Sequence, residues 1–187
     1  MPSRIYPDGA DPSTYRGLPS VYEFINSDGE HRQFNCGQAA ACSMLAFVGT
    51  IANDLDSENA RSTMTAIEDA HPPDNLGGWL GTSRRRVERI CRRHGIELGE
   101  IDGEDALRES LAAGRPVLVM LQTDGARFWK WRIPAGHWML AYGYDERQIF
   151  FTNNGGCGMT WEEFRSRWNA IIPRCIRMRN VGLAAAL

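Results

Sequence analysis

The stretch HRQFNCGQAAACSML, residues 31–45, changes at Cys36 from polar, turn-prone residues to small and apolar ones. From Cys36 to about residue 52 the apolar side chains recur at helical spacing, so we predict a helix that begins at the cysteine. A cysteine at such a position can be a core residue, half of a disulfide, a metal ligand or a nucleophile. The remainder of the sequence has to discriminate among these four interpretations.

Length and composition are those of an ordinary globular domain. The chain has 187 residues, of which 43% are hydrophobic and 24% charged, and this is enough to bury a core. The formal net charge of −2 argues against a nucleic-acid partner, and no apolar run reaches the roughly 20 residues of a membrane span. Residues 1–30 lack the apolar segment of a secretory signal peptide. We therefore expect a cytoplasmic protein with reduced thiols, or one exported without a Sec-type signal peptide.

Hydrophobic periodicity and breaker residues predict an α+β protein, in which helices come first and antiparallel strands later. We predict a single domain over residues 1–187, with an irregular arm over 1–34 and a core over 35–180. Residues 53–81 read as polar and then loop-like. The remaining predicted elements are helices over 84–94, 104–113 and 160–168, and strands over 117–121, 137–145, 147–153 and 174–179.

Two of these helices carry capping signals at their starts. Thr82 or Ser83 can accept a hydrogen bond from the first turn of the helix over 84–94. Thr160 and Glu163 together form a capping box. We therefore expect each helix to begin directly after its capping residue.

Cys36, His137 and Asn153, in that chain order, are the residues whose types and positions indicate chemistry. A thiol attacks a carbonyl as the thiolate, so we expect a helix N-terminus and a nearby histidine to lower the pKa of Cys36. Gly37 is expected to let a substrate backbone approach the cysteine. His137 opens a predicted strand after a Pro-Ala-Gly turn, where its ring can point into a cleft. The two strands after this turn read as an antiparallel hairpin, which returns Asn153, or its neighbour Asn154, to the side of His137.

The other cysteines and histidines have simpler interpretations. Cys42 lies inside the first helix, and Cys91 and His94 lie on the apolar face of the second, so we expect all three in the core. No second Cys/His pair completes a zinc site with Cys91 and His94, and we therefore predict no metal. Cys157 reads as a loop residue and His71 as a surface residue. No motif indicates a cofactor.

Four segments of this chain, taken in order, resemble those of the C39-like papain-fold cysteine peptidases, a group related to the domains that cleave bacteriocin leader peptides. The resemblance covers roughly residues 33–168, and it rests on the order and spacing of the segments. They are NCGQAAACSML around the cysteine, LRESLAAGRPVLVML from helix to strand, GHWMLAYGYD around the histidine, and IFFTNNGG followed by TWEEFRSRW.

This resemblance implies a papain-like cysteine peptidase fold, with an N-terminal nucleophile helix packed on a C-terminal antiparallel sheet. It implies that Cys36 is the nucleophile, that His137 is the general base and that Asn153 orients the histidine. The backbone N–H of Cys36 and the side chain of Gln33 are expected to bind the oxyanion.

The chain departs from the family pattern at three places. In the family a glutamine upstream of the cysteine helps to form the oxyanion hole; here that position is Glu30, and Gln33 is the nearest glutamine. The pair Asn153–Asn154 stands where the family has Asp-Pro. Asn35 stands before the nucleophile where aspartate is common.

We therefore expect a thiol hydrolase that cleaves a peptide or amide bond of a peptide or protein substrate through a thioester on Cys36. An acyltransferase, a transglutaminase-like enzyme or a deamidase is compatible with the same residues, because the cleft and not the triad selects the acceptor. The three departures also leave open a binding module on a papain-like scaffold, with weak or no activity. The sequence does not indicate an oligomeric state.

Overall fold

The computed structural model describes residues 6–18, 34–51, 58–74, 81–123, 126–128, 131–133, 135–152, 158–169 and 180–186. The predicted strand over 174–179 and the candidate residues Gln33, Asn153, Asn154 and Cys157 lie outside these ranges. Within the ranges, no helix is long and apolar enough to cross a membrane.

Three consecutive helices follow β1 in the described chain, and most of the strands lie in its second half. The helices are α1 (Cys36–Phe47), α2 (Glu58–Ala70), α3 (Arg84–Arg93), α4 (Gly103–Ala112) and α5 (Trp161–Trp168). The strands are β1 (Arg16–Gly17), β2 (Leu98–Asp102), β3 (Val117–Gln122), β4 (Ala126–Phe128), β5 (Trp131–Ile133), β6 (Gly136–Tyr144), β7 (Gln148–Thr152), β8 (Gly158–Thr160) and β9 (Val181–Ala185). β4 and β5 pair only with each other.

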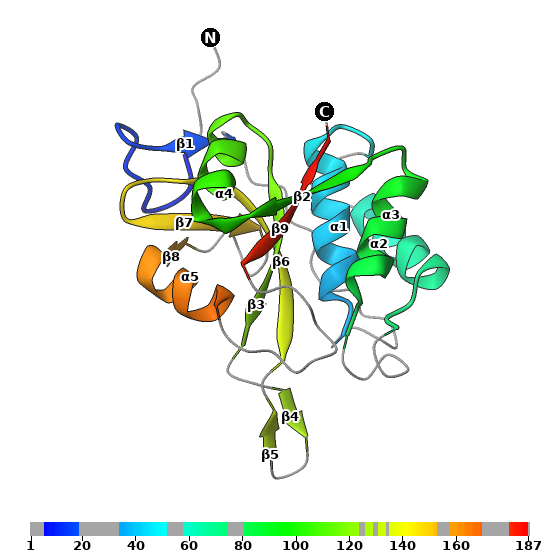
Figure 1. Cartoon of the computed structure of the whole chain (residues 1–187). Helices are drawn as coiled ribbons and strands as arrows, with labels where there is room; N and C mark the ends of the chain where they lie inside the picture. The colour runs from blue at the N-terminus through cyan, green and yellow to red at the C-terminus, as the bar shows by residue number, and fades with distance from the viewer. Residues whose placement is uncertain are drawn as a thin grey trace.

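An antiparallel sheet lies at the centre of the molecule (Figure 1). Its strands follow the order β2-β9-β3-β6-β7-β8, and β1 pairs with the far end of β6. Figure 1 shows α1, α2 and α3 on one side of this sheet and α4 and α5 on the other. The predicted α+β class, with N-terminal helices packed on an antiparallel sheet, is confirmed.

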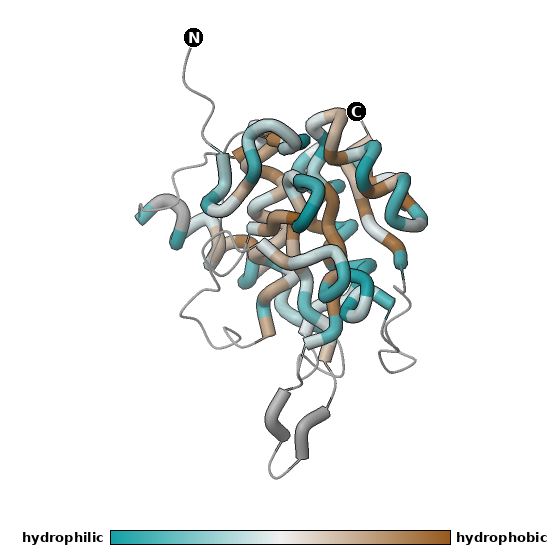
Figure 2. The backbone as a smooth tube through the Cα atoms, turned by 90° about the vertical axis from the view of Figure 1, so that its left-hand side faces the viewer, coloured by the Kyte–Doolittle hydropathy of each residue, from teal (hydrophilic) through white to brown (hydrophobic). Residues whose placement is uncertain are grey.

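Strand β6 separates two apolar cores, because its side chains alternate between the two faces of the sheet. Trp138 and Leu140 pack with residues of α1, α2 and α3, whereas Met139 and Ala141 pack with residues of α4 and α5. Each of these four side chains is 5% exposed or less. Figure 2 shows hydrophobic segments in the interior and hydrophilic ones along the outer turns of the helices.

The structure contains elements that the sequence patterns do not indicate. α2 is largely polar, and Met64, Ile67 and Glu68 are its buried residues among those whose side chains are described. β9 lies beyond residue 180, where the core was expected to end, and it pairs with both β2 and β3. Because Gly and Ala have weak strand propensity, this pairing on both edges is what holds β9 extended. α1 ends at Phe47, earlier than predicted.

Of the predicted caps, Ser83 caps α3 and Thr160 caps α5, whereas the Glu163 carboxylate of the predicted capping box pairs with Arg167 at 3.0 Å. The Ser83 hydroxyl accepts a hydrogen bond from the backbone N–H of Arg86 at 3.2 Å, at the start of α3. The Thr160 hydroxyl accepts one from the backbone N–H of Glu163, also at 3.2 Å, at the start of α5. Each cap satisfies one of the N–H groups that the first turn of a helix leaves without an intrahelical acceptor.

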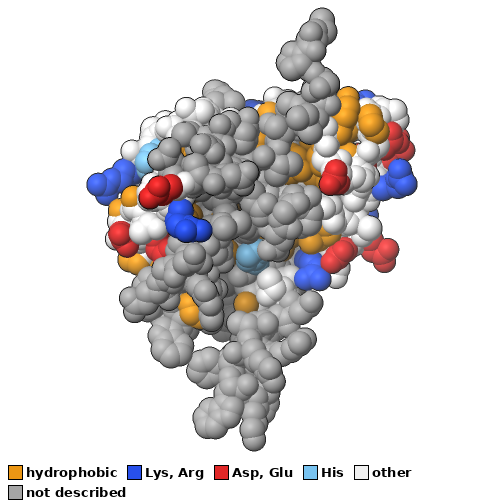
Figure 3. All heavy atoms as spheres, turned by 180° about the vertical axis from the view of Figure 1, so that it is seen from behind, with side chains coloured by type: hydrophobic (Ala, Val, Ile, Leu, Met, Phe, Trp, Pro, Cys, Tyr) orange, Lys and Arg blue, Asp and Glu red, His pale blue; other side chains and the backbone are white. Residues whose placement is uncertain are grey.

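Charged side chains are distributed without a dominant sign. On the face shown in Figure 3, acidic and basic side chains of described residues are interspersed. On α3, Arg84 pairs with Glu88 at 2.7 Å and with Glu100 at 2.6 Å, and Arg86 lies 3.5 Å from Asp74. The arginines of this helix are therefore partly neutralised by neighbouring carboxylates.

The far end of β6 holds the N-terminal residues against the sheet. Gly143 lies so close to the Tyr15 side chain that a Cβ at this glycine would overlap the Tyr15 hydroxyl. Buried Asp145 accepts a hydrogen bond from the backbone N–H of Asp11 at 3.0 Å, and two more, both at 2.8 Å, from the turn that follows it. The glycine and the aspartate of the GYD segment therefore have structural roles.

Replacing Gly143 with alanine should lower the free energy of unfolding by about 1–3 kcal/mol, because the new methyl group would displace the Tyr15 ring. Unfolding in denaturant measures the change. Gly99→Ala in β2 is the matched control, because the nearest atom to a Cβ at that glycine is 4.0 Å away. If the Gly143→Ala protein were as stable as the Gly99→Ala protein, this account of Gly143 would be wrong.

Candidate active site

Cys36 is the first residue of α1, as predicted, and its side chain is 8% exposed. Asn35 is the N-cap residue, but its side chain does not cap the helix. Its amide instead donates a hydrogen bond to the Glu68 carboxylate of α2 at 3.0 Å. The side chain of Asn35 thus leaves the N–H groups of the first turn open to a group bound beside Cys36.

Burial raises the pKa of the Cys36 thiol, which is the opposite of the lowering expected from its helix position. The reason is that a thiolate loses its hydration in the protein interior. The backbone N–H groups of Trp138, Gly37 and Cys36, which lie near the sulfur, lower the pKa but do not outweigh burial. Cys36 is therefore a protonated thiol at neutral pH.

His137 is the second residue of β6 and lies opposite Leu121 of β3. Burial lowers the pKa of its imidazole, which is therefore neutral at neutral pH. The N–H that reaches the Cys36 sulfur belongs to the peptide bond between His137 and Trp138. The sulfur of Cys36 thus lies against the backbone of the strand that carries His137.

The predicted hairpin is present as β6 and β7, which are antiparallel. Thr152, the last residue of β7, pairs with Leu140, the middle residue of β6. Asn153, Asn154 and Gln33 lie outside the described residues, so their roles remain predictions.

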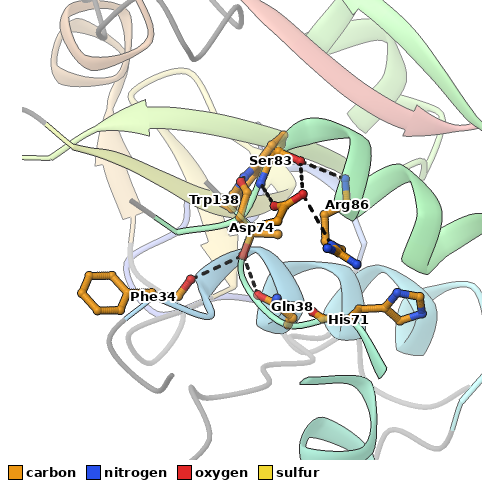
Figure 4. Close-up of polar contacts among 8 residues, drawn as sticks. Phe34, Gln38, His71, Asp74, Ser83, Arg86 and Trp138 are labelled. Carbon is orange, nitrogen blue, oxygen red and sulfur yellow. Dashed lines mark hydrogen bonds and ion pairs between the residues drawn. The ribbon is translucent and has the colours of Figure 1, made fainter. Parts of the chain in front are cut away.

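Thr82, in the loop before α3, contacts both the first turn of α1 and the start of β6. Its hydroxyl donates to Gln38 Oε1 at 2.6 Å and has a longer contact of 3.4 Å to the Phe34 carbonyl oxygen. The indole N–H of Trp138 donates to the Thr82 carbonyl oxygen at 2.8 Å. The Gln38 amide nitrogen donates to the carbonyl oxygen of His71 at 2.7 Å. Figure 4 shows this network, which the sequence patterns do not reveal.

Gly37 makes room for Thr82, and the approach of a substrate backbone at this glycine stays a prediction. A Cβ at Gly37 would lie 2.6 Å from the Thr82 Cβ and 2.9 Å from its methyl group. The absence of a side chain at Gly37 therefore lets the loop pack directly on the turn that carries the cysteine.

The other cysteines and histidines have mixed outcomes. Cys42 and Cys91 are fully buried in the core that includes Cys36, as predicted. Cys42 Sγ lies 3.6 Å from Met64 Sδ, and burial raises the pKa of Cys91 to about 12. His94 is the C-cap residue of α3 and is half-buried, not a core residue. His71 is 4% exposed, so its prediction as a surface residue is wrong.

No family model and no curated protein matches this sequence, but solved structures match its fold. The peptidase domain of Streptococcus ComA, a bifunctional ABC transporter involved in quorum sensing, is 14% identical with a TM-score of 0.57, over 88% of this chain and 98% of that one. A protein from Bacillus anthracis described as a C39-like peptidase is 12% identical with a TM-score of 0.55, over 82% and 88%.

A third match is a double-glycine-motif protease from an AMS/PCAT transporter, solved in complex with its leader peptide. It is 13% identical with a TM-score of 0.51, over 81% of this chain and 83% of that one. At these identities the comparisons establish the fold alone. The chain has the papain-like α+β fold of C39 peptidase domains, as its sequence segments predicted.

His71, whose carbonyl accepts from Gln38, has an unusual environment for an imidazole. Neither of its ring nitrogens has a hydrogen-bond partner among the described residues. Burial lowers the pKa of the ring, and the positive charges of Arg93, Arg86 and Arg89 lower it further. The folded protein therefore favours neutral His71.

This environment should make the protein less stable in acid. The folded pKa of His71 lies below the ordinary 6.5, so the unfolded chain binds the proton more readily, and stability that is present above pH 6.5 is lost as the pH falls below it. The His71→Gln protein should lose less stability than the wild type as the pH falls. Protonation of His137 lowers the stability in acid equally in both proteins. Denaturant unfolding at about pH 5 and about pH 8 measures the difference. Equal pH dependence in the two proteins would contradict the assignment to His71.

Proposed function

We propose that this protein is a papain-like cysteine peptidase, in which Cys36 is the nucleophile and His137 the general base. The observation that supports this most directly is the proximity of the Cys36 sulfur to the backbone N–H of Trp138, the residue that follows His137. The Cys36 sulfur thus lies beside the backbone of the strand that carries His137. The likeness of the fold to C39 peptidase domains supports the same assignment.

The directions of the two pKa shifts support a neutral thiol and imidazole in the resting enzyme. As the Cys36 sulfur attacks the carbonyl carbon, His137 accepts the thiol proton. The tetrahedral intermediate then collapses: the C–N bond breaks, and the imidazolium returns the proton to the departing amine. Water attacks the resulting thioester with His137 again as base, which releases the acid and restores the thiol.

Backbone N–H groups supply the stabilisation of the developing oxyanion in this proposal. The N–H of Cys36 lies at the N-terminus of α1, where the helix dipole favours negative charge. Gln33 is the proposed second donor. Asn153, with Asn154 as the alternative, is the residue proposed to hold the His137 ring in its working orientation.

An extended peptide is the substrate class we propose. One protein of the same fold was solved with a leader peptide bound, and a peptide bond supplies the acyl carbonyl and the leaving group that thioester formation needs. A transferase or deamidase would use the same steps with another acceptor or another amide. A binding module is the second candidate, because burial raises the pKa of Cys36 and so opposes thiolate chemistry.

Alkylation of single cysteines tests the proposed pair. Iodoacetamide should modify Cys36 faster than fully buried Cys42 and Cys91, and His137→Asn should slow this reaction about a hundredfold near neutral pH, because no base then removes the proton. The acid limb of the wild-type pH–rate profile should lie below 6.5, because burial lowers the pKa of His137. Mass spectrometry of the digested protein reports each site.

The control for this experiment is Ser110→Ala. Ser110 is a buried residue of α4 whose hydroxyl donates to the Arg115 carbonyl at 3.1 Å, and it packs away from Cys36. This variant should alkylate like the wild type. An unchanged alkylation rate in His137→Asn would rule out the histidine as the general base.

The product distinguishes the chemistries. A pool of synthetic peptides incubated with the wild-type protein should be cut at backbone amides, and Cys36→Ala should leave the pool intact. Conversion of a side-chain amide to an acid would instead indicate a deamidase, and a new linkage would indicate a transferase. Peptide binding by both proteins without any change in mass would indicate a binding module. Mass spectrometry of the pool, with a pull-down of bound peptides, measures all four outcomes.

A further inference from the structure

Thr82 forms hydrogen bonds both to helix α1, which begins at Cys36, and to strand β6, which contains His137. Its hydroxyl bonds to Gln38, which lies two residues after Cys36 in α1. Its carbonyl oxygen accepts from the indole of Trp138, which follows His137 in β6. Thr82 therefore contacts both sides of the proposed active site through separate atoms.

The contacts of Thr82 are buried and tightly specified. Gln38 is 0% exposed, Thr82 2% and Trp138 1%. Both ends of the Gln38 amide are used, because its oxygen accepts from Thr82 and its nitrogen donates to the His71 carbonyl. A buried polar group that loses its partner is costly in this environment. These bonds therefore restrict the first turn of α1 far more than apolar packing alone would.

The loop that carries Thr82 is itself anchored. The Asp74 carboxylate accepts hydrogen bonds from the backbone N–H and the hydroxyl of Ser83, both at 2.8 Å. The backbone N–H of Asp74 donates to the Gly81 carbonyl oxygen at 3.2 Å, and Arg86 lies 3.5 Å from the same carboxylate. Asp74 thus forms hydrogen bonds with Gly81 and Ser83, the two residues that flank Thr82.

Van der Waals contact adds to the hydrogen bonds. The Thr82 side chain occupies the place that a Cβ at Gly37 would fill. Its hydroxyl, its methyl group and its carbonyl oxygen therefore each contact a different part of the site, and the separation between the turn of Cys36 and the start of β6 is determined at Thr82.

We infer that Thr82 is a positioning residue, which holds the Cys36 sulfur at the distance from His137 that proton transfer requires. The inference rests on the proposed function, because it assigns Thr82 to the pair that the proposal names. The hydrogen bonds of Thr82 are to Gln38, Trp138 and the Phe34 carbonyl, and it acts on the proposed pair through Gln38 and Trp138.

Three variants test the inference by the alkylation rate of Cys36. Thr82→Val keeps the shape and removes the hydroxyl, so Gln38 Oε1 loses its donor, and the rate near neutral pH should fall about tenfold. Thr82→Ser keeps the hydroxyl and should stay within about twofold of the wild type. Trp138→Phe removes the indole donor and keeps the backbone N–H beside Cys36. Its alkylation rate should fall, as in Thr82→Val. The Ser110→Ala protein is again the matched control.

A double-mutant cycle with His137→Asn separates positioning from simple loss of stability. If Thr82 acts through His137, Thr82→Val should slow alkylation in the wild-type background and have no further effect in the His137→Asn background. Equal slowing in both backgrounds, or none in either, would overturn the inference. The thermal unfolding midpoint of each variant confirms that it is folded, and Trp138→Phe with Thr82→Ser completes the test if Thr82→Val does not fold.

The outcome of His137→Asn alone distinguishes the two proposals. If His137→Asn slows alkylation and Thr82→Val does not, the proposed pair of Cys36 and His137 stands, and the inference about Thr82 is wrong. If His137→Asn has no effect, the proposed function fails, and the role of Thr82 fails with it.

Discussion

The structure around Cys36 depends on the burial of polar side chains in the first turn of α1. Asn35 and Gln38, on either side of the cysteine, are fully buried and have to find partners inside the protein. Asn35 finds the carboxylate of Glu68, and Gln38 finds Thr82 and the His71 carbonyl. These requirements join α1 to α2 and to the loop before α3, and so determine where the sulfur lies.

The same burial sets the chemistry of the site. Burial of the sulfur raises the pKa of Cys36, and partial burial of the imidazole lowers that of His137. Both groups are therefore neutral at neutral pH. Backbone N–H groups beside the sulfur oppose this effect without reversing it. In the proposed mechanism, charge therefore develops only when the thiol attacks, and backbone N–H groups at the start of α1 can stabilise it at that moment.

The fold is shared with proteins that are 12–14% identical, and strand β6 indicates why so few identities suffice. Alternation along β6 sends Trp138 and Leu140 to one core and Met139 and Ala141 to the other, and this requires only apolar side chains of suitable size. A specific residue type is required at only a few positions, such as Gly143 against the Tyr15 side chain and Asp145 in the turn after β6.

Local interactions account for the helices, caps and strands that could be predicted from the sequence. The start of α1 at Cys36, the caps at Ser83 and Thr160, the buried strand β3 and the β6–β7 hairpin all follow from residues within a few positions of one another. The polar helix α2, the strand β9 and the burial of His71 were decided by tertiary structure, as was Thr82 beside Gly37. Thr82 meets Gln38 across 44 residues and Trp138 across 56. No periodicity or cap encodes such contacts, because they form only when packing brings distant segments together and buried polar atoms require partners.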